Sequence, residues 1–365
     1  RGLGDVYKRQ VPDAEKVQAR EAAWQKEVKE KRMSVIELKA SEIPTEKVDY
    51  QPVPEELPGK AGKIVESLSV DQLALLATGD PGRAQGNALG SAGISVPGAA
   101  AETSPCASEE PWNVTTIALV DGPAGLRITQ SYKDGDQTYY QYATAWPIGT
   151  LLAQTWDTDQ IYAYGEGVGE EMEEFGIGCW LAPGMNIHRN ALCGRNFEYY
   201  SEDPVVVGIT GTAATLGVQS NKGVGVTIKH YALNSQETNR NAENNTVSER
   251  AIREIYLKGF EIAVKESRPM SIMTSYNLIT GVPTADSYDL CTNIARGEWG
   301  FDGMVMTDWG AGNRAGVDTM MHAGNDLIMP GGASKANEII IGAEDVKPTF
   351  EANGQIGLKD ELMYM

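Results

Sequence analysis

The 365-residue sequence has few of the residues that build disulfides and metal centres. Its four cysteines (Cys106, Cys179, Cys193 and Cys291) are widely separated and form no C-x-x-C pair, and its three histidines show no H-x-x-x-H spacing. Scattered cysteines of this kind are typical of free thiols in a reducing compartment, so we predict a cytoplasmic protein. The histidine pattern argues against a structural metal site.

Basic residues are also scarce. The 31 Lys and Arg residues face 50 Asp and Glu residues, which gives a net charge of −19. Such an acidic protein repels phosphate backbones and acidic lipid surfaces, so we expect neither nucleic acid nor a membrane as a partner. No run in the sequence approaches the roughly 18 consecutive apolar residues that a membrane-spanning helix needs. Hydrophobic residues make up 41% of the chain, enough for one large α/β barrel or two medium domains.

The first part of the chain differs in composition from the rest. The sequence opens on Arg1 rather than Met and shows no charged-then-apolar leader. Residues 13–40 alternate acidic and basic side chains and predict an exposed helix, whereas residues 41–60 contain four prolines and predict an extended linker. A linker so early suggests that a folded domain precedes it. We therefore divide the chain into an N-terminal helix and Pro-rich linker (1–60), a main domain (61–340) and a tail (341–365).

From about residue 115 onward, short apolar runs alternate with longer amphipathic stretches. The runs predicted as strands are 116–120, 180–187, 224–228, 270–274, 304–306 and 326–329. The stretches predicted as helices are 158–175, 205–220, 248–267, 288–299 and 313–323. In residues 248–267 the apolar side chains recur three and four positions apart, which is typical of a helix packed on a sheet. Strands that alternate with helices indicate a parallel sheet.

Two parallel architectures fit this alternation. A doubly wound sheet needs a glycine fingerprint directly after a strand, but the nearest candidate, Gly165 to Gly169, lies within a helical stretch and has the wrong spacing. A (β/α)8 barrel needs polar residues at the carboxyl ends of many strands, and the sequence has them. We predict a TIM-like α/β barrel with about six clear strands and the remaining ones irregular. Residues 79–114, rich in Gly, Ala, Pro and Ser, predict a long loop.

Polar side chains follow the predicted strands where each one ends. Because the carboxyl ends of barrel strands surround one mouth, we expect these side chains to meet. Carboxylates, amides and basic groups hydrogen-bond hydroxyls, and aromatic rings stack on sugars, so the set indicates a polyhydroxylated substrate. A faint glycine pair at Gly331 and Gly332 keeps a phosphate role open. The strand-end residues are Asp121, Asn186, His188, Lys229, His230, Ser275, Tyr276, Asn277, Asp308 and Trp309.

Five separated motifs resemble the barrel domain of family 3 glycoside hydrolases of the β-glucosidase type. They occur in the same order as in that family and cover residues 65–335. The motifs are DGPAGLR (121–127), GRNFEYYSEDP (194–204), KHYALNSQETNR (229–240), MTSYN (273–277) and MTDWG (306–310).

The resemblance implies a role for each matching residue. Asp308 is implied as the nucleophile, which attacks the anomeric carbon and forms a covalent glycosyl-enzyme. Basic neighbours would then hold the pKa of Asp308 down and keep it ionised. Neither metal nor organic cofactor is implied. The residues implied to bind hydroxyls are Asp121, Arg195, Lys229 and His230; Arg240 and Tyr276 would orient the nucleophile, and Met273 and Trp309 would form the pocket wall.

A general acid is missing from this set. A retaining glycosidase needs a second, protonated carboxyl group, which in two-domain family members comes from another domain. We expect that domain to lie outside this chain, on the upstream side if the Pro-rich linker marks its boundary. Within the chain, Glu198 and Glu237 are the only candidates. The loop after Lys229 and His230 holds neither a second His nor an Asp, which argues against the family's N-acetylglucosaminidase type.

The resemblance thus implies a retaining, exo-acting β-glucosidase whose partner is a β-glucoside or oligosaccharide. The alternatives are a β-xylosidase or other exo-β-glycosidase, and a sugar-binding barrel fragment without turnover. The oligomeric state is open. Two inserts, 79–114 and 129–142, are interpreted as rim loops. The second carries four tyrosines that would either stack on an aglycone sugar or pack on the surface: Tyr132, Tyr139, Tyr140 and Tyr142.

Overall fold

In the computed structural model every described residue lies within residues 49–365. The predicted N-terminal helix, nearly all of the linker and the tail fall outside the described residues. The described residues are 59–80, 95–106, 111–311, 316–332, 334–336 and 338–339.

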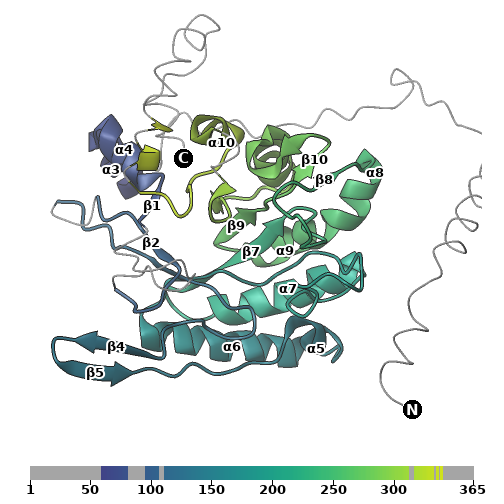
Figure 1. Cartoon of the computed structure of the whole chain (residues 1–365), viewed down its shortest axis with the longest axis horizontal. Helices are drawn as coiled ribbons and strands as arrows, with labels where there is room; N and C mark the ends of the chain where they lie inside the picture. Colours follow the sequence, from purple (N-terminus) through teal and green to yellow (C-terminus); the bar gives the residue numbers. More distant parts are fainter. Residues whose placement is uncertain are drawn as a thin grey trace, which may run out of the picture. The chain divides into compact units, whose positions relative to one another are not determined.

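Seven strands form one sheet in the order β1–β2–β3–β6–β7–β9–β12. Figure 1 labels β1, β2, β7 and β9 of this sheet. From β3 to β12 all neighbours are parallel, whereas β2 is antiparallel to both β1 and β3. The strands are β1 (Gly79–Asp80), β2 (Ala101–Thr103), β3 (Ala118–Val120), β6 (Cys179–Trp180), β7 (Gly225–Tyr231), β9 (Ser271–Thr274) and β12 (Met304–Met306).

Residues 327–329 connect the two edges of this sheet and close it into a barrel. On one side the Thr307 N–H donates to the Leu327 carbonyl at 3.0 Å, beside β12. On the other side the Gly79 N–H donates to the Ile328 carbonyl, also at 3.0 Å, beside β1. The predicted TIM-like barrel is therefore confirmed, with residues 327–329 as its eighth segment.

The sequence prediction was wrong for residues 79–114, which contain β1 and β2 in addition to loops. These two strands are two and three residues long. Segments so short show no alternation of polar and apolar residues, and that alternation is the main sequence signal for a strand. The six strands that were predicted coincide with β3, β6, β7, β9, β12 and the closing segment 327–329.

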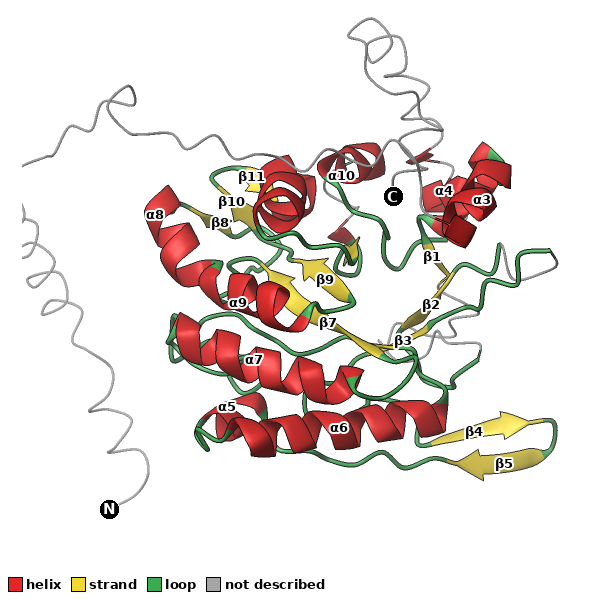
Figure 2. Cartoon of the chain, turned by 180° about the vertical axis from the view of Figure 1, so that it is seen from behind, coloured by secondary structure: helices red, strands yellow, loops and turns green. Residues whose placement is uncertain are grey.

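Three long helices lie side by side against the sheet: α6, α7 and α9 (Figure 2). The carboxylates of Asp157 and Asp203 cap α6 and α7, and Pro204 occupies the first turn of α7. The helical elements are α3 (Gly59–Ser67), α4 (Val70–Leu76), α5 (Gly149–Ala153), α6 (Thr158–Phe175), α7 (Pro204–Gln219), α8 (Glu249–Ala251), the π-helical turn η2 (Ile252–Tyr256), α9 (Lys258–Ser267), the 3-10 turn η3 (Thr284–Asp286), the π-helical stretch η4 (Asp289–Glu298) and α10 (Val317–Ala323).

Two small sheets lie outside the barrel. The first is a hairpin of β4 (Ser131–Asp134) and β5 (Gln137–Tyr140), which forms within the insert predicted as a rim loop. Its Tyr132 and Tyr139 rings stack across the strands with centroids 5.5 Å apart. The second small sheet contains β8 (Asn244–Asn245), β10 (Leu278–Ile279) and β11 (Val282–Pro283).

The barrel strands separate two hydrophobic cores. In β3, Ala118 and Val120 belong to the core shared with the outer helices, whereas Leu119 belongs to a smaller core with Met273 and Met306. Successive side chains of a strand point to opposite faces, so this smaller core fills the barrel interior. The interior core consists of Ala100, Ala101, Leu119, Cys179, Leu181, Met273, Met306, Leu327 and Met329.

The contact between α6 and α7 depends on glycine. A Cβ atom on Gly217 would lie 2.1 Å from the Tyr162 carbonyl oxygen and 2.9 Å from the Gly165 Cα. Both obstacles are backbone atoms, so no side-chain rotation relieves the clash. We expect Gly217→Ala to lower the free energy of unfolding by about 1–3 kcal/mol, although alanine favours helix over glycine.

Urea denaturation of the chain measures this effect. Gln160→Ala, which introduces alanine at an exposed position of α6, is the matched control. It should change the free energy of unfolding by about 0.5 kcal/mol or less. A Gly217→Ala variant as stable as the parent would show that the two helices can separate at no cost.

Candidate active site

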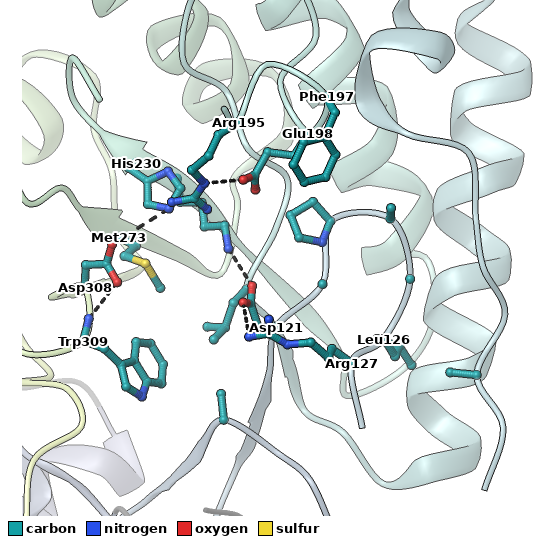
Figure 3. Close-up of a pocket in the computed structure, with 18 of the residues that line it drawn as sticks. Asp121, Leu126, Arg127, Arg195, Phe197, Glu198, His230, Met273, Asp308 and Trp309 are labelled. Carbon is teal, nitrogen blue, oxygen red and sulfur yellow. Dashed lines mark hydrogen bonds and ion pairs between the residues drawn. The ribbon is translucent and has the colours of Figure 1, made fainter. Parts of the chain in front are cut away.

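A pocket of about 600 Å³ opens at the carboxyl ends of the barrel strands (Figure 3). Figure 3 shows Asp308 and Trp309 on one side of it and Asp121 and Arg127 on the other. The structure brings together all nine residues predicted for the site. They are Asp121, Arg195, Lys229, His230, Arg240, Met273, Tyr276, Asp308 and Trp309.

Strand periodicity explains why these residues meet. Asp121 follows the interior residue Leu119 by two positions, and Asp308 follows Met306 by two. A spacing of two keeps a side chain on the same face of a strand, so both carboxylates continue the interior row toward the carboxyl-terminal mouth. Lys229, in the last part of β7, reaches Asp121 from two strands away, since β6 lies between β3 and β7.

Asp308 is a buried carboxylate, with its residue 7% exposed. The Trp309 N–H donates to its Oδ1 at 2.7 Å, and His230 Nε2 lies 3.9 Å from its Oδ2. Burial raises the pKa of Asp308, while Lys229 and Arg195 act in the opposite direction. The expectation that basic neighbours hold this pKa down was therefore wrong in sign, because loss of solvent outweighs their charge.

The pKa of Asp121 is shifted in the opposite direction from that of Asp308. Its Oδ1 accepts from Lys229 Nζ at 2.7 Å and its Oδ2 accepts from Arg127 Nη2 at 2.8 Å. Burial alone would raise the pKa of Asp121, but the charges and hydrogen bonds of Lys229 and Arg127 lower it to about 2. Asp121 is thus a fixed anion, with the cation of Lys229 beside it almost fully buried.

Arg195 enters the pocket from the loop between β6 and α7. Its Nε donates to Glu198 Oε1, three residues further along the same loop. Burial lowers the pKa of Arg195, but Tyr199 and Glu198 outweigh burial and raise it. The guanidinium therefore remains charged, and Glu198 restricts its orientation.

Arg240 and Tyr276 line the pocket close to Asp308. The guanidinium carbon of Arg240 lies over the Tyr276 ring, 4.8 Å from its centroid, and Arg240 Nη1 donates to Glu237 Oε2 at 2.8 Å. The Tyr276 hydroxyl donates to the Trp309 carbonyl at 2.7 Å. Burial, followed by the charge of Asp308, raises the pKa of Tyr276, so the hydroxyl keeps its proton.

The backbone of His230 is bonded on both sides to the side chain of Asn186. Its N–H donates to Asn186 Oδ1 at 2.8 Å, and Asn186 Nδ2 donates back to the His230 carbonyl at 2.8 Å. The imidazole is 2% exposed, and burial together with the charges of Arg195, Lys229 and Arg240 lowers its pKa well below the usual value. His230 is therefore neutral at physiological pH.

The remaining strand-end residues have supporting positions. Asn186 binds the backbone of His230, and Ser275 and Asn277 both donate to the Ala232 carbonyl, at 2.9 and 3.1 Å. The lining residues do not include His188 or the tyrosines of the β4–β5 hairpin; residues 143–145 reach the pocket instead.

Sequence reasoning missed several residues of the site. Arg127 and Phe197 line the pocket, as does Glu198, which had been considered only as an acid. All three lie inside the quoted motifs, Arg127 at the end of DGPAGLR and the other two in GRNFEYYSEDP. Their position in these motifs was the available signal, but only the fold shows that they face the same cavity.

The pocket has the groups that hydroxyl recognition needs: a fixed anion, buried cations and a neutral imidazole.

Among the described residues, no group of three or more His, Cys, Asp and Glu side chains is placed to hold a metal ion. Over the same part of the chain, no helix combines the length and the apolar character needed to cross a bilayer. The chemistry available is that of carboxylates, cations and hydroxyls.

Curated relatives show which proteins this chain is similar to in sequence. Beta-glucosidase A of Butyrivibrio fibrisolvens is 43% identical over 265 residues, which are 73% of this chain and 29% of that protein. Exo-alpha-(1->6)-L-arabinopyranosidase of Bifidobacterium longum is 43% identical over 219 residues, 60% of this chain and 28% of that protein. The chain therefore spans less than a third of the length of these relatives.

A solved structure gives the same result for the fold. Beta-glucosidase 3B from Thermotoga neapolitana in complex with glucose superposes with a TM-score of 0.72 at 41% identity, over 84% of this chain and 42% of that one. Residues 113–335 match the family model described as glycosyl hydrolase family 3 N terminal domain. The resemblance in the sequence motifs is thus confirmed: the chain belongs to glycosyl hydrolase family 3 and contains the N-terminal domain of that family.

Proposed function

We propose that this chain carries the nucleophile and the sugar-binding half of a retaining, exo-acting β-glucosidase. The observation that carries the proposal is the setting of Asp308, a buried carboxylate at the end of β12 that faces Lys229 and Arg195 across a sugar-sized pocket. The relatives named beta-glucosidase and the neighbour structure with bound glucose support a glucoside as the substrate.

The reaction follows the double-displacement scheme of retaining glycosidases. An Asp308 oxygen attacks the anomeric carbon, the bond to the leaving-group oxygen breaks, and a covalent glycosyl-enzyme forms. Water then attacks the same carbon and releases the sugar with retained configuration. Asp121 accepts hydrogen bonds from sugar hydroxyls while Lys229 and Arg195 donate them, and these bonds stabilise the oxocarbenium-like transition state as they tighten.

The general acid is proposed to come from outside the described residues. Glu198 and Glu237, the two internal candidates, are paired with Arg195 and Arg240 respectively. These ion pairs already engage one carboxyl oxygen of each residue, so we do not assign the general acid to either of them. The relatives are more than three times as long as the region they share with this chain, which leaves room for a second domain that supplies the acid.

A reducing compartment is proposed for the chain on the basis of its cysteines. All four are free, and burial raises the pKa of Cys179 to about 11 and that of Cys291 to about 12. Buried thiols with raised pKa values are protonated and unreactive near neutral pH.

Covalent trapping tests the nucleophile. An activated 2-fluoro glucoside with a dinitrophenolate leaving group needs no proton on departure, so it bypasses the acid. We expect mass spectrometry to show one fluoroglucosyl group per chain, attached to Asp308, and no label on Asp308→Asn. Asp134→Asn, an exposed carboxylate in β4, is the matched control and should label like the parent. Label on another residue, or reversible binding without label, would refute the proposed role of Asp308.

The pH dependence of labelling follows from the two pocket carboxylates. The pKa of Asp308 is raised, and a protonated carboxyl group is not a nucleophile, so the labelling rate should fall as the pH drops through that pKa. The midpoint should lie above the ordinary Asp value of about 3.9. Asp121, with a pKa of about 2, stays ionised and does not contribute. The labelling rate, measured at a series of pH values, gives this midpoint. A midpoint below the ordinary Asp value would contradict the raised pKa of Asp308.

Removal of the charge on Asp121 should weaken recognition of the sugar. We expect Asp121→Asn to lower the second-order labelling constant by about 10- to 100-fold, because a hydrogen bond to a charged group contributes about 1.5–3 kcal/mol. A thermal melt on the same sample separates this loss from unfolding, since Lys229 loses its ionic partner too. Unchanged labelling would place the sugar hydroxyls elsewhere.

A second candidate substrate is a pentopyranoside. The arabinopyranosidase relatives, at 43% identity over the barrel, favour it. Activated glucosyl, β-xylosyl and α-L-arabinopyranosyl inactivators can be compared on one preparation. Faster labelling by glucoside supports the β-glucosidase, whereas faster labelling by either pentoside supports the second candidate.

A further inference from the structure

A chain of buried and partly buried hydrogen bonds runs behind the pocket and connects two of its basic residues, His230 and Arg240. His230 Nδ1 lies 3.1 Å from the Tyr199 hydroxyl, which accepts from Asn234 Nδ2 at 3.1 Å. Asn234 Nδ2 also donates to Glu237 Oε1 at 3.2 Å, and Glu237 Oε2 accepts from Arg240. Tyr199 and Asn234 are both completely buried and do not line the pocket.

The direction of each bond in this chain follows from chemistry. The carboxylate of Glu237 only accepts, so the Asn234 atom that faces it must be the amide nitrogen, which only donates. The Tyr199 oxygen therefore receives a hydrogen bond from Asn234, and its own proton is directed to its other neighbour, His230 Nδ1. Burial raises the pKa of Tyr199 well above its usual value, so this proton is always present.

His230 has a competing neighbour at the same nitrogen. Asn186 Oδ1 lies 3.3 Å from Nδ1, but it already accepts the His230 backbone N–H at 2.8 Å. That backbone donor also fixes the orientation of the Asn186 amide, so Oδ1 can only accept from the ring. Tyr199 and Asn186 thus favour opposite tautomers of the imidazole, and the shorter contact is that of Tyr199.

We propose that Tyr199 is a positioning residue that holds the proton of neutral His230 on Nε2, so that the imidazole presents an N–H donor to the pocket. Nε2 lies 3.9 Å from Asp308 Oδ2, beyond hydrogen-bond distance, so this N–H is available to a substrate hydroxyl beside the nucleophile. The inference rests on the proposed function, since it assigns to that site a neutral donor in place of a further cation.

A neutral His230 leaves Asp308 available as the nucleophile. An imidazolium at this distance would be a charged partner for Asp308 and would compete with attack on the anomeric carbon. The charged groups around the ring are Arg195, Lys229 and Arg240, which disfavour a further proton, and Asp308, which favours one. Burial acts with the three cations, and His230 therefore keeps one tautomer between about pH 5 and 8.

Nitrogen NMR of the full chain, labelled with ¹⁵N at histidine, reads the tautomer directly. The chain has three histidines, and His188→Gln and His322→Gln variants assign the other two. We expect a pyrrole-type shift for His230 Nε2 and a pyridine-type shift for Nδ1, without titration over this pH range. The reverse pair of shifts, or a titrating ring, would overturn the proposal. The measurement needs no turnover, so it stands even if labelling of Asp308 fails.

Tyr199→Phe tests the cause. Only Asn186 Oδ1 would then face Nδ1, so we expect the proton to move to Nδ1 and the two shifts to exchange. The affinity for the 2-fluoro glucoside should fall by about tenfold, as one donor is lost. Tyr200→Phe removes the hydroxyl of the adjacent, equally buried core tyrosine and should change neither quantity. Unchanged shifts in Tyr199→Phe would show that Tyr199 does not set the tautomer, whatever the effect on stability.

Discussion

Charge pairing inside the barrel mouth is the constraint on which the site depends. Taking a charge out of water costs several kcal/mol, and the cost is recovered only if an opposite charge and further hydrogen bonds are at hand. Asp121 and Lys229 meet this condition across 108 residues of sequence, at 2.7 Å. Arg195 meets it with Glu198. These pairs hold the pocket's charges at fixed positions before any substrate binds.

Asp308 differs from the other carboxylates of the pocket. Among the described residues, Asp121 and Glu198 each form an ion pair with a Lys or Arg side chain. Asp308 instead lies 3.9 Å from the neutral imidazole of His230. The Trp309 N–H and the side chain of Tyr276 also hydrogen-bond to Asp308, and both lower its pKa. The unequal partners explain why one carboxylate has a lowered pKa and the other a raised one.

A layer of neutral polar residues stands behind the charged ones. Asn186, Tyr199 and Asn234 are nearly or fully buried, and each bonds to a residue that borders the pocket or to its immediate support. Buried amides and hydroxyls tolerate burial only when they are bonded, so they specify one arrangement of the side chains in front of them. Buried polar groups thus support the charged side chains of the pocket from behind, and the pocket offers many hydrogen bonds to a sugar.

Much of the barrel was predictable because its signals are local. Helix α6 matches its predicted range, since Asp157 caps it and Gly176 ends it, and β12 matches because three apolar residues are followed by polar ones. Strands β1 and β2 were not predictable, because two or three residues carry no periodicity. The nine site residues were named from motifs, and the fold gathers all of them in one pocket.

The five motifs, the order of strands β3 to β12 and the nine pocket residues named from the motifs were predicted from the sequence alone, since they depend on residue type and short spacing. Three features were decided only by the tertiary structure: the closure of the barrel through residues 327–329, the raised pKa of Asp308 and the orientation of His230. Each depends on how deeply a group is buried and on which distant groups surround it. Solvent exclusion and long-range contacts are properties of the folded chain, and no local pattern encodes them.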